Sequence, residues 1–158
     1  MRVLIFLTMF CFSVCAQEME GTVTAIIDGN TIEFQTHEND VFKFVLADID
    51  CPELEQDFGL EAKVFLEKLL TGKISSITVE GKDRLGNRVG VLRYKGRDPR
   101  LDLLARGLAW TAEKKPELQL EQLKEVAKSS GKGLWKQENP TPPWVFRRQQ
   151  TMLVAKSS

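Results

Sequence analysis

Oxygen-bearing side chains gather in two short segments of the sequence. One is the turn Asp28-Gly29-Asn30, and the other carries Asp48, Asp50 and Glu53. Several carboxylate and amide oxygens at neighbouring strand ends are typical of a Ca²⁺ site, because Ca²⁺ takes hard oxygen ligands. The same residues also suit simpler roles, since Asp-Gly-Asn favours a hairpin turn and a run of acids favours a solvated loop. Composition alone leaves both interpretations open.

Each of these segments lies at the end of a predicted strand. Small or apolar residues alternate with polar ones over residues 19–27 and 32–34, which predicts two strands around the first turn. A third strand is expected over residues 40–49, ending at Cys51-Pro52, where the proline stops ladder pairing. Two more strands, over residues 74–80 and 88–94, flank a turn that contains Gly86-Asn87.

Three stretches show helical spacing of apolar residues instead. They cover residues 58–70, 101–108 and 118–127, and glycines follow the first at position 72 and the last at position 131. Five strands with one helix in the middle and two at the end predict a mainly β, α+β fold. A small Greek-key barrel accounts for this order better than a layered alternating α/β plan.

The N-terminal segment has the pattern of a signal peptide. Arg2 precedes an apolar run over residues 3–14, and the small Ala16 suits cleavage before Gln17. We therefore expect a signal peptide over residues 1–16 and a secreted or periplasmic protein, with lipidation at Cys15 as the weaker alternative. The mature chain then keeps Cys51 as its only cysteine, so that packing rather than an internal disulfide must stabilise it.

The overall charge gives no support for a polyanion partner. Without Arg2, 21 of the 22 basic residues remain, against 22 acidic residues. Proteins that bind nucleic acid usually show an excess of positive charge. Any such function must therefore depend on a local site.

Six segments, taken in order, resemble the staphylococcal nucleases. Residues 27–32 resemble that family's DGDT turn, and residues 46–53 resemble its L-x-G-I-D-x-P-E segment. The other matches are Phe58-Gly59 with Glu61-Ala62, then residues 83–87 at the place of D-R-Y-G-R, Gly107-Leu108-Ala109-Trp110, and Gly133-Leu134-Trp135. The resemblance implies a five-stranded OB-fold barrel with about three helices over residues 17–146, followed by a C-terminal tail over residues 147–158.

The resemblance also implies a secreted, Ca²⁺-dependent phosphodiesterase that cuts DNA and RNA. Its carboxylates hold the ion, a glutamate activates water, and two arginines stabilise the transition state. In this sequence the resemblance places metal ligands at Asp50, Asn30 and the backbone carbonyl of Cys51. Asp28 is expected to contact these ligands rather than the ion. Glu53 takes the place of the water-activating glutamate.

Three departures from the family pattern bear on activity. Asn30 replaces the second aspartate of DGDT, and ligand charge is a main determinant of Ca²⁺ affinity, so we expect weak or absent binding, about millimolar or weaker. Val45 and Asn87 stand where the family carries its two arginines. Each lost donor is typically worth about 10²–10³ in rate. We expect most of the catalysis to be lost.

Two other cations offer a possible replacement for those arginines. Lys43 lies two residues before Val45, on the same strand face, and Arg88 follows Asn87 directly. Neither offset preserves the geometry of a bidentate phosphate contact, so an exposed cation on the barrel rim is the simpler interpretation of each.

The remaining polar and aromatic candidates have ordinary interpretations. His37 lies in a polar hairpin, the three tryptophans are expected to be core and tail anchors, and Arg147-Arg148 form a small basic end. We predict a secreted nuclease homologue that binds nucleic acid or nucleotides, with impaired or lost cleavage. The alternatives are an active Ca²⁺-dependent endonuclease that uses Glu53 with Lys43 or Arg88, and a non-catalytic OB-fold interaction module. A monomer without an integral membrane partner is expected.

Overall fold

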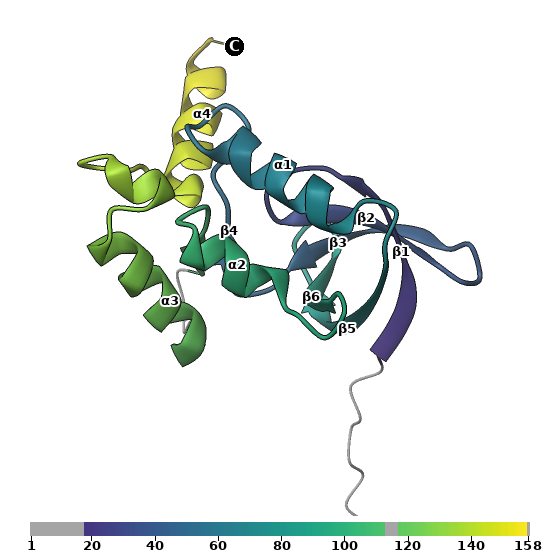
Figure 1. Cartoon of the computed structure of the whole chain (residues 1–158). Helices are drawn as coiled ribbons and strands as arrows, with labels where there is room; N and C mark the ends of the chain where they lie inside the picture. Colours follow the sequence, from purple (N-terminus) through teal and green to yellow (C-terminus); the bar gives the residue numbers. More distant parts are fainter. Residues whose placement is uncertain (1–17, 113–116, 158) are drawn as a thin grey trace, which may run out of the picture.

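The computed structural model describes residues 18–112 and 117–157, and its centre is a closed barrel of five strands (Figure 1). Neighbours around the barrel are β1, β2, β3, β6 and β5, and β5 pairs back with β1. The predicted OB-type barrel is confirmed. Its strands are β1 (Glu18–Ile26), β2 (Thr31–Thr36), β3 (Val41–Leu46), β5 (Ile74–Lys82) and β6 (Arg88–Arg93).

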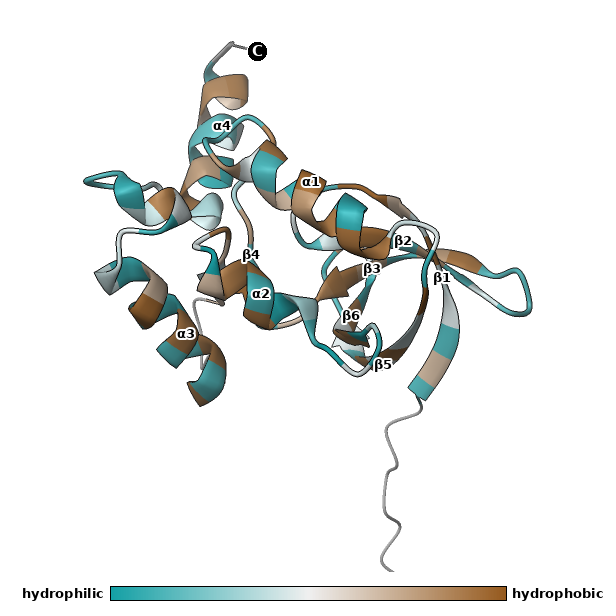
Figure 2. Ribbon diagram, in the orientation of Figure 1, coloured by the Kyte–Doolittle hydropathy of each residue, from teal (hydrophilic) through white to brown (hydrophobic). Residues whose placement is uncertain are grey.

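The alternation seen in the sequence fills the barrel interior. Val23, Phe34, Phe44, Ile77 and Leu92 are completely buried, one from each strand. Burying each such side chain is worth about 1.5–3 kcal/mol relative to leaving it exposed. Figure 2 shows hydrophobic residues, in brown, within the strands of the barrel.

Helix α1 (Gly59–Leu70) closes one end of the barrel with its buried face, which includes Leu66 and Leu70. Gly59 allows the helix to start close to the preceding loop, because a Cβ at this position would lie 1.9 Å from the carbonyl oxygen of Glu53. This contact fixes the segment that carries the predicted site relative to the barrel.

The other helices lie beside the barrel, around a short ladder between β4 (Ile49–Asp50) and β7 (Trp110–Thr111). The third predicted strand therefore divides into β3 and β4, with Asp48 at a left-handed φ of 61° between them. The helices here are α2 (Pro99–Ala105), α3 (Leu118–Ser129), the 3₁₀ helix η1 (Gly133–Lys136) and α4 (Pro143–Ser157).

Helix α4 is not predicted from the sequence. The predicted boundary between residues 146 and 147 lies inside it, because the helix begins at Pro143 and meets no proline or glycine before Ser157. The C-terminal part of α4 projects from the body of the molecule in Figure 1. The predicted signal peptide, with Cys15, lies outside the described residues. No helix within residues 18–112 and 117–157 is long and apolar enough to cross a membrane.

Candidate active site

The first turn of the predicted site is a compact loop closed by Asp28. Its Oδ1 accepts hydrogen bonds from the backbone N–H of Asn30 at 2.9 Å and of Thr31 at 2.7 Å. These bonds hold the chain between β1 and β2 in a fixed turn. The Oδ1 atom of Asp28 is therefore engaged by two backbone N–H groups.

The two turns lie against each other, as the sequence indicated. Asn30 Oδ1 accepts a hydrogen bond of 3.1 Å from the backbone N–H of Cys51, and the Cys51 thiol donates to the Gly29 carbonyl at 3.1 Å. A Cβ at Gly29 would lie 2.5 Å from the Cβ of Cys51, so that only glycine permits this approach. Burial raises the pKa of the Cys51 thiol well above its usual value, and nearby carboxylates add to the rise. A thiolate is disfavoured at this position.

Arg147, on the first turns of α4, binds both site carboxylates. Its Nη1 donates to Asp50 Oδ1 at 3.1 Å and to Glu53 Oε1 at 2.6 Å, and its Nη2 donates to Asp50 Oδ2 at 2.7 Å. The Asp50 side chain is 19% exposed, that of Glu53 31% and that of Arg147 50%. A half-exposed guanidinium thus spans the two acids from the solvent side in a bidentate contact, the strongest geometry for such a pair.

The charges at this contact affect one another. The hydrogen bond to Asp50 raises the pKa of Arg147, and the bond to Glu53 adds to the effect, so the guanidinium stays charged at any accessible pH. Burial raises the pKa of Asp50 while Arg147 lowers it, and the neighbouring Asp28 carboxylate adds to the rise. Arg147 therefore offsets part of the cost of holding these acids together.

The donor oxygens, in this arrangement, do not fit a calcium ion. Both oxygens of Asp50 and Oε1 of Glu53 point at Arg147, and Oδ1 of Asn30 points at a backbone N–H. No group of three or more His, Cys, Asp or Glu residues in the described part of the chain is arranged to hold a metal. Calcium needs six to eight oxygens at about 2.3–2.6 Å. The side chains that the resemblance implies as ligands are present. Their oxygens named here accept hydrogen bonds from N–H groups of the protein.

The two candidate replacement cations lie away from these acids. Lys43 is exposed and pairs in register with Glu33 on β2. The Arg88 guanidinium lies 3.6 Å from the ring centroid of Phe42, a cation–π contact. Neither makes an ion pair with Asp50 or Glu53 within the residues that the structure describes. Their predicted phosphate contacts remain a prediction.

The two positions of the missing arginines are filled by residues with other contacts. Val45 lies between Thr31 on β2 and Val89 on β6 and is partly buried. Asn87 Nδ2 donates to Asp83 Oδ2 at 2.8 Å, and its backbone N–H donates to Asp83 Oδ1 at 2.9 Å. These bonds lower the pKa of Asp83 and close the turn between β5 and β6. Neither position brings positive charge to the site.

Asp48, counted among the candidate ligands from sequence, turns away from the site. Its Oδ2 lies 3.5 Å from Nη1 of Arg100, a buried residue on α2. Arg100 in turn donates to Asp98 Oδ2 at 2.8 Å and to the Ala47 carbonyl at 3.1 Å. The left-handed backbone of Asp48 directs it there, at the position where the family pattern has glycine. Asp48 is a structural residue.

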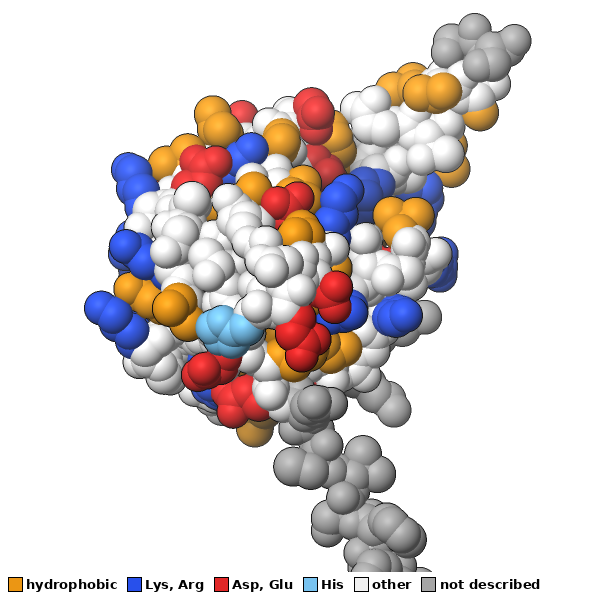
Figure 3. Space-filling view, turned by 90° about the vertical axis from the view of Figure 1, so that its right-hand side faces the viewer, with side chains coloured by type: hydrophobic (Ala, Val, Ile, Leu, Met, Phe, Trp, Pro, Cys, Tyr) orange, Lys and Arg blue, Asp and Glu red, His pale blue; other side chains and the backbone are white. Residues whose placement is uncertain are grey.

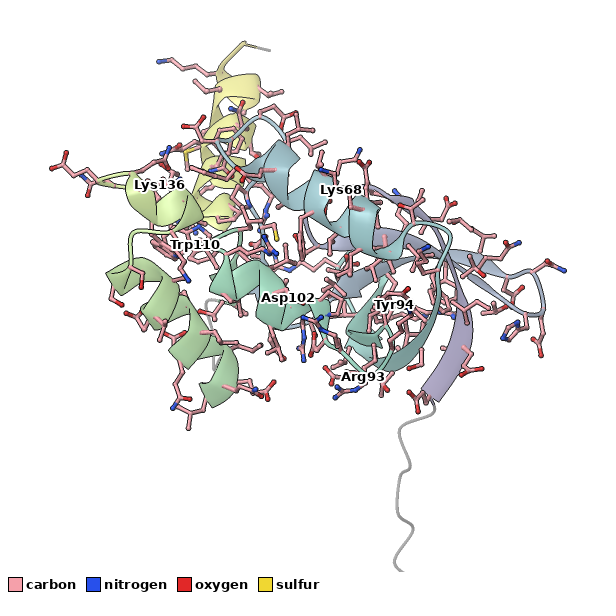
Figure 4. All side chains as sticks on the ribbon, viewed as in Figure 1. Lys68, Arg93, Tyr94, Asp102, Trp110 and Lys136 are labelled. Carbon is pink, nitrogen blue, oxygen red and sulfur yellow. The ribbon has the colours of Figure 1, made fainter. Side chains whose placement is uncertain are left out.

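Arg147 is the site residue that sequence reasoning missed. Trp144 lies three residues earlier on the same face of α4, and its ring centroid is 5.7 Å from that of Trp110 on β7. Trp110 is labelled in Figure 4. Gln56 Nε2 also donates to the Thr141 carbonyl at 2.9 Å, beside a pocket of about 200 Å³. These contacts place the first turn of α4 so that Arg147 reaches the acids. The available signal was a Pro-Pro-Trp helix start shortly before a pair of arginines.

Known proteins are similar to this chain over most of its length. The family model of staphylococcal nuclease homologues matches residues 43–137. An uncharacterized endonuclease of Escherichia coli O157:H7 is 32% identical over 95% of this chain and 100% of its own length. One from Haemophilus influenzae is 33% identical over 90% of this chain and 82% of its own. A micrococcal nuclease of Shigella flexneri is 31% identical over 83% and 82% of the two chains.

Proposed function

Since the chain belongs to the family of staphylococcal nuclease homologues, we propose that it binds nucleic acid or nucleotides and cleaves phosphodiester bonds poorly or not at all. The observation that carries the proposal is that few cationic side chains are directed at the site. Val45 and Asn87 stand at the arginine positions, and Arg147 is held by Asp50 and Glu53.

The physical argument concerns charge in the transition state. Phosphodiester cleavage builds negative charge on the phosphate oxygens, and guanidinium groups stabilise it. Here Asp28, Asp50 and Glu53 carry three negative charges near one another, and Arg147 neutralises one of them. A phosphate approaching this site meets net repulsion unless a further cation binds. Weak Ca²⁺ binding, limited by Asn30 and by Arg147, is part of the proposal.

The surface gives limited help to polyanion binding. Acidic and basic side chains are interspersed on the face shown in Figure 3, and basic side chains also lie near the base of α4. Arg148 is exposed there beside Arg147. We propose that contacts of this local kind, rather than a broad electrostatic field, hold the nucleic acid, which should make binding weak and sensitive to salt.

An active endonuclease is the second candidate, favoured by the names of the relatives from Escherichia coli and Haemophilus influenzae. In that case Glu53 activates water, with Lys43 or Arg88 moving to the phosphate. The non-catalytic interaction module has no specific observation in its favour.

A cleavage assay separates the two candidates. The purified protein is incubated with single-stranded DNA and with RNA, in Ca²⁺ and in EDTA, beside the Glu53→Gln variant. We expect binding to a labelled oligonucleotide and cleavage close to background in every condition. Robust Ca²⁺-dependent cleavage that Glu53→Gln abolishes would overturn the proposal of impaired catalysis in favour of the enzyme.

We also propose that the chain is exported, on the pattern of Arg2, the apolar run over residues 3–14 and Ala16. The test is expression of the full chain in a bacterial host, followed by fractionation and N-terminal sequencing. An N-terminus at Gln17 in the exported fraction supports the proposal. Retention of Met1 in the cytoplasm, or a lipid on Cys15, contradicts free secretion.

A further inference from the structure

We propose that Arg147 and a divalent cation compete for the same carboxylates, so that α4 acts as a latch that keeps the cation out of the site. The proposal rests on the proposed function in that Asp50 and Glu53 are taken as the site acids. It concerns cation binding, which is measured without any nucleic acid. The finding behind it is that these acids hold a guanidinium from their own chain.

Arg147 occupies the positions that a cation would need. Its three hydrogen bonds use both oxygens of Asp50 and one oxygen of Glu53. A divalent ion bound to the same oxygens would stand within a few ångströms of a guanidinium carrying the same sign of charge. Each occupant therefore repels the other, and the acids can serve only one at a time.

The site acids still attract a cation when Arg147 is in place. Asp28 lies close enough to raise the pKa of Asp50 by its charge, so the cluster of Asp28, Asp50 and Glu53 exceeds the single positive charge of Arg147. This residual negative charge favours a divalent ion as the replacement for a monovalent guanidinium. The net negative charge of the site thus favours replacement of Arg147 by a divalent cation.

The first turn of α4 and the segment before it are attached to the rest of the molecule. Trp144 packs on Trp110, and the preceding segment is held through the bond between Gln56 and the Thr141 carbonyl. Farther along the helix, Met152 is 64% exposed and Leu153 62% exposed. The Arg147 side chain itself is 50% exposed, so it can leave the acids while the barrel stays intact.

Arg148 provides a matched control on the same helix. It is the next residue, it is exposed, and it makes no ion pair within the described part of the chain. Arg148→Ala removes the same charge and the same side-chain length from α4 without touching the acids. A general effect of lowering the positive charge of the helix would appear equally in both variants.

The experiment is a calorimetric titration of the full chain with CaCl₂, in the absence of nucleic acid. It compares the wild type with Arg147→Ala, Arg147→Gln and Arg148→Ala, and circular dichroism checks that each is folded. Arg147→Gln retains most of the side-chain volume, in case Arg147→Ala does not fold. We expect both Arg147 variants to bind Ca²⁺ about 10- to 100-fold more tightly than the wild type, the size set by charged hydrogen bonds. The Ca²⁺ affinity of Arg148→Ala should stay within about twofold of that of the wild type, because an exposed charge without an ion pair contributes little.

A second readout follows α4 itself. Competition requires that Ca²⁺ displace Arg147, which removes one of the contacts that hold α4. Hydrogen exchange of the amides in residues 143–151 should therefore speed up in the wild type when Ca²⁺ is added. Equal or weaker Ca²⁺ affinity in the Arg147 variants would overturn the latch, as would failure of every variant to bind Ca²⁺ at about 10 mM, well above the weakest protein sites. Strong nuclease activity of the wild type would contradict the proposed function and leave the competition intact.

Discussion

Asn30 Oδ1 accepts a hydrogen bond of 3.1 Å from the backbone N–H of Cys51, which joins the first turn to the loop that follows β4. A carboxylate can accept this bond equally well, and the Asn30 amide nitrogen has no hydrogen-bond partner within the described residues. Asn30→Asp should therefore change the free energy of unfolding by less than about 1 kcal/mol.

The same substitution should raise affinity for Ca²⁺, because it adds a full negative charge to the cluster of Asp28 and Asp50. Calorimetry and urea unfolding on the same preparation check both expectations. A loss of more than about 2 kcal/mol of stability, comparable to an unpaired buried acceptor, would contradict the structural role given to Asn30.

Restoring all three family residues should restore cleavage. We expect Asn30→Asp, Val45→Arg and Asn87→Arg together to raise the rate on single-stranded DNA by roughly 10²–10⁴, since two guanidinium donors return. Asn87→Arg also removes a side-chain bond to Asp83, at a cost of about 1 kcal/mol, so the variant must be checked by thermal unfolding. A folded triple variant as inactive as the parent would show that the missing charges are not the cause.

The barrel could be predicted from sequence because its signals are local. Alternation over β1 and β2 and the Asp28-Gly29-Asn30 turn each follow from neighbouring residues, and the inward positions Phe34 and Phe44 follow from the same period of two. The proximity of the two acidic turns followed in turn from the order of the strands. These parts of the site needed no long-range information.

The contacts of Arg147 could not be predicted in this way. They join residues 94 and 97 positions apart, and they depend on the direction of α4, which Trp144 fixes by packing on Trp110. The local sequence pattern around an arginine on a polar helix does not indicate which acid it will bind. The prediction that Asp48 belongs to the site was wrong for a related reason. Its left-handed backbone turns its carboxylate away from the site and toward Arg100.

The buried pair of Asp98 and Arg100 should be essential for stability. Asp98 is 7% exposed, its Oδ2 lies 2.8 Å from Arg100 Nη2, and it also caps α2 by accepting from the backbone N–H of Arg100. Asp98→Ala leaves a buried guanidinium without its main partner, and we expect a loss of about 3–5 kcal/mol in urea unfolding.

The control for this prediction is Asp102→Ala, which breaks a pair with Arg97, whose side chain is 75% exposed. That change should cost about 0–1 kcal/mol. Equal losses of unfolding free energy for the two variants would mean that burial of the Asp98–Arg100 pair does not increase its contribution to stability.

Stability should depend on pH through Glu121, which links α3 to the short β4–β7 ladder. Its carboxylate accepts from Thr111 Oγ1 at 2.7 Å and pairs with Lys124, and the hydrogen bond from Lys124 is the main reason that its pKa is lowered from the usual 4.5. A carboxyl group with a lowered pKa in the folded state stabilises that state fully above the unfolded value. This contribution is lost as the pH falls below about 4.5 through the folded value.

Glu121→Gln should therefore destabilise the protein most at neutral pH and least in acid. Because the Glu121 side chain is 34% exposed, solvent screening limits the effect to about 0.5–1 kcal/mol. Urea midpoints of the wild type and the variant, measured from neutral pH down to about pH 3, check the trend through the carboxyl range. Glu125→Gln removes a partner of the same lysine that is 55% exposed, and it should change the midpoint little at any pH. A gap between wild type and Glu121→Gln that stays constant, or widens in acid, would refute the linkage.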